Sequence, residues 1–79
     1  MKPGDLVQTK EQWGHLTLFD KLDCWDIDSK SVTNLKHDQP VLVIAIVNNQ
    51  ALVMVPRRGG AVYFGWREVD NFRVVNEAG

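Results

Sequence analysis

Few side chains in this sequence are suited to covalent chemistry: there is one cysteine, Cys24, and there are two histidines, His15 and His37. A cysteine and a histidine act as nucleophile and base only when the fold brings them within hydrogen-bond reach. No signature of a catalytic cysteine surrounds Cys24, and the neighbouring Asp23 and Asp26 disfavour its thiolate form. We therefore expect a small, partly buried thiol and a protein that is not an enzyme.

A second polar group is acidic and lies between residues 20 and 28, where Asp20, Asp23, Asp26 and Asp28 surround Lys21. Carboxylates are hard ligands, but their spacing does not match a calcium-binding loop, and a zinc site would need pairs of cysteine or histidine. Four acids beside a lysine are also too few to mimic a nucleic-acid backbone. We predict a solvated acidic surface that holds no metal and no cofactor.

The third group is basic and suggests contact with nucleic acid. Arg57 and Arg58 precede Gly59 and Gly60, so a cationic loop could approach phosphate groups with its backbone amides, and a nearby tyrosine could stack on a base. The net charge of −1 and the narrow basic region argue against this function. We keep it as the alternative. Its residues would be Arg57, Arg58, Tyr63 and Arg67.

Length and composition predict one small domain over residues 1–79. The chain has 79 residues, of which 44% are hydrophobic, and this is enough for a single core without disulfides or metal. No apolar stretch approaches the 18 residues of a membrane span, and the opening Met1–Asp5 does not resemble a signal peptide. We expect a cytoplasmic protein without membrane contact.

The clearest structural signal is a three-stranded antiparallel meander over residues 41–66. An apolar run, Val41–Val47, is followed by Asn48 and Asn49, which tolerate the left-handed backbone of a tight hairpin. A second apolar run over residues 51–55 ends at a proline, and a third strand follows after the basic loop. The pattern indicates an all-β protein.

The pairing of these strands can be predicted from their turns. A two-residue turn at 48–49 pairs Ile46 with Ala51 and Ile44 with Val53, and a four-residue loop at 57–60 pairs Val53 with Phe64. The core face would then hold Leu42, Ile44, Ile46, Val53, Val55, Val62, Phe64 and Trp66. The opposite face is also apolar and must be covered by residues 10–40, by a strong curl of the sheet, by another copy of the chain or by a partner. It would hold Val41, Val43, Ala45, Leu52, Met54 and Tyr63.

The segments around the meander complete the expected fold. Residues 6–9 form a short first strand, and 10–40 make a long excursion that is too apolar for a loose loop and should pack against the meander. Thr17 and Asp20 could cap a helical turn, but we favour an extended excursion with a turn at Asp28–Ser31. Residues 67–71 suit one 3₁₀ turn before a last strand at 72–75, which can close against the first.

This order of elements resembles an SH3-like small barrel of about five strands. Supporting stretches are Gly4–Val7, Leu35–Asp38 as a diverging turn, and Gly65-Trp66 followed by Val69 and Phe72. The chain also resembles short SH3-like proteins of bacteria and their phages, and this resemblance implies a bacterial or phage-encoded protein. Peptide-binding SH3 domains carry aromatic and proline positions that residues 5–9, 51–53 and 67–69 lack. Proline-rich ligand binding is therefore not implied.

The excess of apolar surface directs the main functional expectation. Aromatic residues and methionine are frequent in protein interfaces. We expect a non-enzymatic binding or adaptor module that acts through a protein partner or as a homodimer. Its contact residues would be Val43, Leu52, Met54, Tyr63, Trp13 and Trp25.

Overall fold

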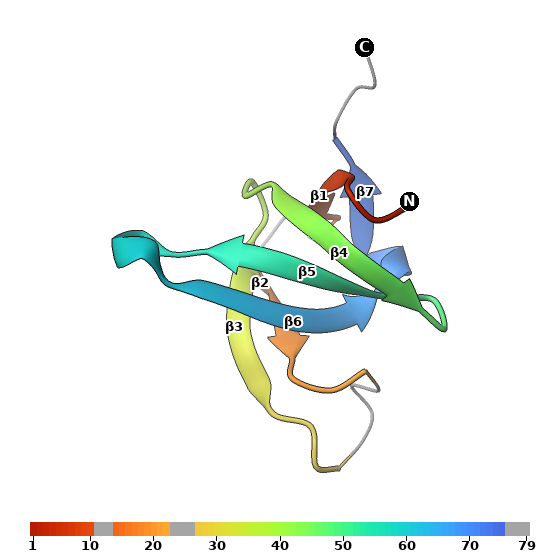
Figure 1. Cartoon of the computed structure of the whole chain (residues 1–79), viewed down its shortest axis with the longest axis horizontal. Helices are drawn as coiled ribbons and strands as arrows, with labels where there is room; N and C mark the ends of the chain where they lie inside the picture. Colours follow the sequence, from red (N-terminus) through yellow and green to blue (C-terminus); the bar gives the residue numbers. More distant parts are fainter. Residues whose placement is uncertain (11–13, 23–26, 76–79) are drawn as a thin grey trace.

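All strands that the structure describes belong to one antiparallel sheet, which curls into a half-barrel (Figure 1). The structure is a computed structural model, and it describes residues 1–10, 14–22 and 27–75. The strands are β1 (Leu6–Thr9), β2 (His15–Phe19), β3 (Ser31–Lys36), β4 (Val41–Val47), β5 (Gln50–Pro56), β6 (Val62–Glu68) and β7 (Phe72–Val74). Two 3₁₀ turns, η1 (Arg58–Gly60) and η2 (Val69–Asn71), interrupt them. The all-β prediction is confirmed.

The sheet order is β3-β2-β6-β5-β4-β1-β7. Seven strands are described where about five were expected, because the excursion over residues 10–40 contributes the hairpin of β2 and β3. The extended form of this segment is confirmed for His15–Phe19 and Ser31–Lys36. The turn predicted at Asp28–Ser31 lies slightly earlier, at Ile27 and Asp28, because Ser31 already belongs to β3. As expected, the last strand closes against the first, with Val7 opposite Val74 and Thr9 opposite Phe72.

The two loops of the meander explain its tight geometry. Asn48 and Asn49 have φ angles of 51° and 62°, the left-handed conformation that a two-residue hairpin turn requires. The turn therefore pairs Ile46 with Ala51, as predicted. The second loop is longer than predicted: the Arg57 amide donates to the Ala61 carbonyl over 2.7 Å, and the strand pairing begins at Pro56 and Val62.

The second loop and a bulge in β4 overturn part of the predicted face assignment. A bulge at Ile44 shifts the register of β4, so that Val43 and not Ile44 lies opposite Val53. The longer second loop shifts β6 by one residue, so that Val53 faces Gly65 and not Phe64. Since strand side chains alternate, each one-residue shift exchanges the two faces. The predicted core residues Leu42, Ile44, Val62, Phe64 and Trp66 are in fact half-buried or exposed.

The core lies on the concave side of the sheet and includes the excursion. Its buried apolar residues are Val7, Leu16, Leu18, Leu35, Val41, Val43, Ala51, Val53, Val55 and Phe72. Leu18 crosses over Gly65, where an added Cβ would lie 2.5 Å from the Leu18 Cβ. A side chain at position 65 would therefore push β2 away from β6. The excursion packs against the core, as expected. Its strands β2 and β3 do not cover the convex side of the sheet (Figure 1).

Backbone hydrogen bonds hold the 3₁₀ turn η2 at both of its ends: the Val69 amide donates to the Asn49 carbonyl, and the Lys10 amide donates to the Asn71 carbonyl, each over 2.8 Å. The first contact joins the β4–β5 turn to η2, which precedes the final strand. In the described ranges, no helix is long and apolar enough to cross a membrane.

Candidate protein-contact surface

The convex side of the sheet carries apolar side chains in rows that run across the strands. Leu6 lies opposite Leu42, Leu42 opposite Met54, and Met54 opposite Phe64. Directly opposed residues in antiparallel strands share a face, and their Cβ atoms lie about 5 Å apart. These four side chains therefore form one continuous row over β1, β4, β5 and β6.

A second row lies beside the first, on the side of the β4–β5 turn. Ala45 lies opposite Leu52, and Leu52 opposite Trp66, which in turn pairs with Phe19 of β2. On the other side of the first row, next to the β5–β6 loop, Pro56 pairs with Val62. We call the resulting surface the outer face. It consists of Leu6, Leu42, Ala45, Leu52, Met54, Pro56, Val62, Phe64 and Trp66.

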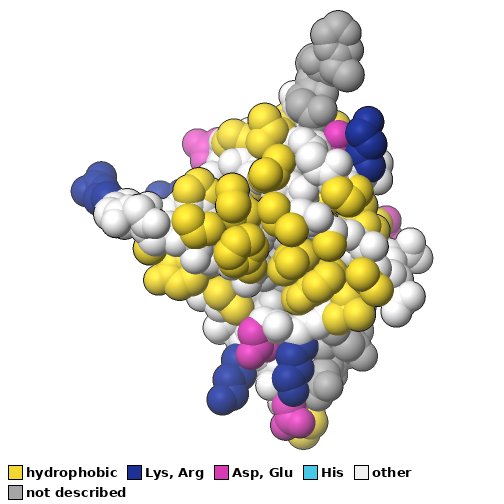
Figure 2. Space-filling view, viewed as in Figure 1, with side chains coloured by type: hydrophobic (Ala, Val, Ile, Leu, Met, Phe, Trp, Pro, Cys, Tyr) yellow, Lys and Arg dark blue, Asp and Glu magenta, His cyan; other side chains and the backbone are white. Residues whose placement is uncertain are grey.

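The outer face is exposed to a degree that is unusual for such large apolar side chains. Phe64 is 48% exposed, Val62 46% and Leu6 41%, and the bulge residue Ile44 is also exposed. Figure 2 shows that apolar side chains cover the front of β4, β5 and β6, whereas charged side chains lie around this area and not within it. An uncharged apolar surface of this extent is typical of contact sites.

The structure separates the six predicted contact residues. Leu52 and Met54 lie together on the outer face. Val43 is 1% exposed and belongs to the core, because the bulge at Ile44 turns it inward, so it cannot contact a partner. Tyr63 pairs with buried Val55 and is 42% exposed on the other face of β6 from Phe64. The remaining two, Trp13 and Trp25, lie outside the described residues.

Sequence reasoning missed Phe64 and Trp66 as surface residues, although one signal pointed to them. Gly65 stands between these two aromatic residues, and a glycine inside a strand often marks the close approach of another segment. That approach places Gly65 on the core side, so its neighbours must face outward. The bulge at Ile44 left no such signal, since the whole run Val41–Val47 is apolar.

The basic loop is less available for phosphate groups than its sequence suggests. The Arg57 guanidinium donates hydrogen bonds to the Asn34 carbonyl, the Thr33 hydroxyl and the Gln39 side chain. Two of these partners belong to β3, the strand at one edge of the sheet. Arg57 therefore joins the β5–β6 loop to this edge strand.

The other arginines of the nucleic-acid alternative do not combine with Arg57 into a site. Arg67 donates to the Thr17 carbonyl over 3.0 Å, forms an ion pair with Glu68 at 3.2 Å and lies 5.5 Å from the centre of the Phe19 ring. Arg58 is exposed at the tip of the β5–β6 hairpin and makes no hydrogen bond or ion pair with the described residues. One free arginine and one exposed tyrosine are a weak basis for binding nucleic acid.

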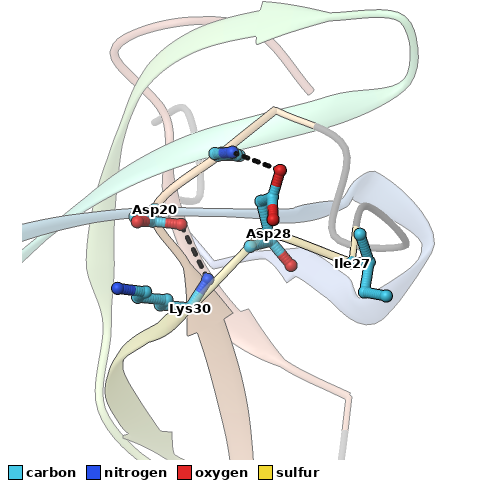
Figure 3. A pocket seen from close by; sticks show the side chains of 6 residues that line it. Asp20, Ile27, Asp28 and Lys30 are labelled. Carbon is cyan, nitrogen blue, oxygen red and sulfur yellow. Dashed lines mark hydrogen bonds and ion pairs between the residues drawn. The ribbon is translucent and has the colours of Figure 1, made fainter.

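An open hollow of about 450 Å³ lies at the tip of the β2–β3 hairpin (Figure 3). Its polar groups are engaged with one another: the Asp20 carboxylate accepts from the Lys30 amide over 2.8 Å, and Asp28 lies 3.9 Å from Lys21. These contacts hold the two strands of the hairpin together. The lining residues are Asp20, Lys21, Ile27, Asp28, Ser29 and Lys30.

The described residues contain no group of three or more His, Cys, Asp or Glu that could hold a metal ion. His15 on β2 and His37 after β3 are both exposed. The remaining residues of the catalytic and acidic hypotheses, Asp23, Cys24 and Asp26, lie outside the described residues.

Comparisons with models of protein families, with curated proteins and with solved structures found no significant match.

Proposed function

We propose that this protein is a small, non-enzymatic binding or adaptor module that contacts another protein surface through its outer face. The observation that carries the proposal is the pair of apolar rows across β1, β4, β5 and β6. These rows lie on the side of the sheet that the β2–β3 hairpin does not cover. Phe64 and Trp66 are aromatic anchors of the kind that dominate interface energies. Met54, opposite Phe64 on β5, has a flexible side chain that can adapt to the shape of a partner.

We further propose that the half-barrel is an SH3-like barrel of phage origin, acting in the cytoplasm. The support is the order of elements: a first strand, a hairpin excursion, a three-stranded meander, a 3₁₀ turn and a last strand that pairs with the first. Fold alone does not specify a ligand, so the functional proposal depends on the outer face.

Nucleic-acid binding is the weaker alternative. Two of its three arginines, Arg57 and Arg67, already hold β3 and β2 to the rest of the sheet. A ligand would have to compete for these guanidinium groups, which would loosen the sheet edge.

Photo-cross-linking in cells that produce the chain tests the proposed contact. A benzophenone amino acid would replace Phe64 in one variant and Ile27 in the control, because Ile27 is 96% exposed but lies at the hairpin tip. We expect a covalent protein adduct from position 64 and none from position 27. Absence of an adduct at position 64, or equal adducts at both positions, would contradict the proposal. Mass spectrometry of the adduct identifies the partner as this chain or as another protein.

A further inference from the structure

We infer that the partner adds an extended segment of its own chain to β6, as a further strand beside Val62–Phe64. The inference rests on the proposed function and names the kind of partner that this surface takes: a strand-like, apolar segment of another protein. It is based on an unpaired stretch of backbone at the edge of β6 and on the exposed side chains that flank this stretch.

The register of β6 determines which of its backbone groups face away from β5. The Arg57 amide donates to the Ala61 carbonyl, and hydrogen-bonded pairs alternate along antiparallel strands. Tyr63 therefore directs its amide and carbonyl towards β5. Val62 and Phe64 direct theirs towards the opposite edge of the strand.

No strand lies beside that edge at these two residues. β2 pairs with β6 through its last residue, Phe19, which lies opposite Trp66. Among the described residues, none hydrogen-bonds with the outward amides and carbonyls of Val62 and Phe64. Figure 1 shows that the end of β6 next to η1 extends past the β2–β3 hairpin. Two donors and two acceptors therefore repeat over about 6.8 Å, a pattern that an extended polypeptide backbone matches.

The other open edges of the sheet are interrupted within the described part of the chain. Arginine side chains occupy the Asn34 carbonyl on β3 and the Thr17 carbonyl on β2. On β7 the Phe72 amide donates to η2, and on β4 a bulge at Ile44 breaks the row of backbone groups. Such features protect sheet edges from pairing with other chains. The described residues place none of them along Val62–Phe64, which makes this edge the place where a strand can add.

The side chains of the same stretch supply apolar contacts on both faces of an added strand. Val62 is 46% exposed, Tyr63 42% and Phe64 48%. Val62 and Phe64 lie on the outer face, and neighbouring strands share their faces. A segment with apolar residues at alternate positions would therefore continue the apolar row that ends at Phe64. Backbone pairing provides the affinity of this contact, and the side chains provide its preference.

A second copy of this chain does not fit the edge through its own β6. In a two-fold antiparallel pairing centred on Tyr63, the second copy's Gly60 would lie opposite Trp66, where Phe19 already pairs. Gly60 also has a φ of 85° and belongs to η1, so the backbone is not extended there. The strand that is open for pairing is thus excluded as its own partner, which favours a segment of another protein.

A proline at position 62 tests the backbone pairing in the cross-linking experiment. Val62→Pro removes an amide that faces away from β5, and Ala61, at φ −68° and ψ 142°, already has the extended conformation that precedes a proline. With benzophenone at position 64, Val62→Pro should lower the adduct yield by about tenfold or more, because a hydrogen bond is lost and the ring obstructs the added strand. Val62→Thr keeps the amide and is the matched control, with a yield within about twofold of the parent. The NMR spectrum of purified Val62→Pro verifies its fold.

Hydrogen exchange of the wild type covers the case in which Val62→Pro fails to fold. The cross-linked segment, identified by mass spectrometry, is synthesised and added to isotope-labelled protein. We expect the amides of Val62 and Phe64 to exchange rapidly in the free protein and about tenfold or more slowly with the synthetic segment, as newly paired amides do.

The outcomes separate this inference from the proposed function. Equal exchange with and without the synthetic segment, or an undiminished adduct from folded Val62→Pro, would overturn the strand addition and leave the contact through the outer face intact. An adduct with a second copy of this chain would overturn the assignment to another protein. Absence of any adduct from position 64 would contradict the proposed function itself and the inference with it.

Discussion

A single missing side chain, at Gly65, allows the excursion to close over the meander. Leu18 occupies the space that a Cβ at this position would need, and both residues are buried. The absence of a side chain at position 65 thus allows β2 to cross close to β6. It also fixes which face of β6 is exposed, since Phe64 and Trp66 must point away from Leu18.

Gly65→Ala should strongly destabilise the fold. The new Cβ would meet the Leu18 Cβ at 2.5 Å, and relief requires a shift of β2 rather than a rotation of a side chain. Overpacking of this kind costs about 1–3 kcal/mol. Val62→Ala, at an exposed position of the same strand, is the control and should cost less than about 1 kcal/mol. Thermal unfolding measures both; an unchanged melting temperature for Gly65→Ala would show that β2 does not cross at this point.

The identity of the contact residues could be predicted only in part. Leu52 and Met54 were assigned to the outer face because β5 alternates regularly and contains no irregularity. Val43 was misplaced because an apolar run gives no sign of which side chains alternate inward. The aromatic residues of β6 were assigned to the wrong face because the β5–β6 loop is one residue longer than predicted. The hydrophobicity of the side chains does not reveal this error when both faces of the strand are apolar.

Among the elements, turns were more predictable than registers. The pair Asn48-Asn49 has a conformational preference that few residue types share, so the first hairpin turn followed from composition alone. The first strand, the 3₁₀ turn and the closing strand were also expected close to their observed positions. The excursion was expected to be extended with a turn at Asp28–Ser31, but neither its pairing as the β2–β3 hairpin nor its place beside β6 was predicted. The packing of Leu18 against Gly65 joins residues far apart in the sequence, which the local pattern does not reveal.

The β4–β5 turn offers a test at this scale. Asn49→Ala should lower the free energy of unfolding by about 1 kcal/mol. Position 49 has a φ of 62°, which strains an alanine, because alanine lacks the side-chain amide that lets asparagine tolerate the left-handed backbone. That change corresponds to roughly 4–8 °C in melting temperature for a domain of this size. Asn49→Gly should match or exceed the wild type, because Asn-Gly is a preferred sequence for this turn. Equal melting temperatures for Asn49→Ala and Asn49→Gly would contradict the role of the left-handed backbone.

At the scale of the whole molecule, the curl of the sheet creates an asymmetry between its faces. The concave side receives Leu16, Leu18 and Leu35 from the excursion and forms the core. The convex side carries a comparable apolar pattern but has no second layer in the described residues (Figure 1). An antiparallel sheet with one solvated face normally alternates apolar and polar residues, so the departure from alternation in β4, β5 and β6 supports the proposed contact with a partner.

Salt dependence distinguishes this apolar association from a charge-driven one. Sodium sulfate should strengthen the proposed contact through the outer face, because excluded salts favour the burial of apolar surface, whereas moderate sodium chloride should change it little. Contacts through the charged groups around the face would instead weaken as sodium chloride screens them over about 10 Å or less. The yield of the adduct cross-linked at position 64, measured in cell extract at each salt concentration, reports the strength of the contact. A yield that falls steeply in sodium chloride would transfer the interface from Phe64 and Met54 to the charged margin of the sheet.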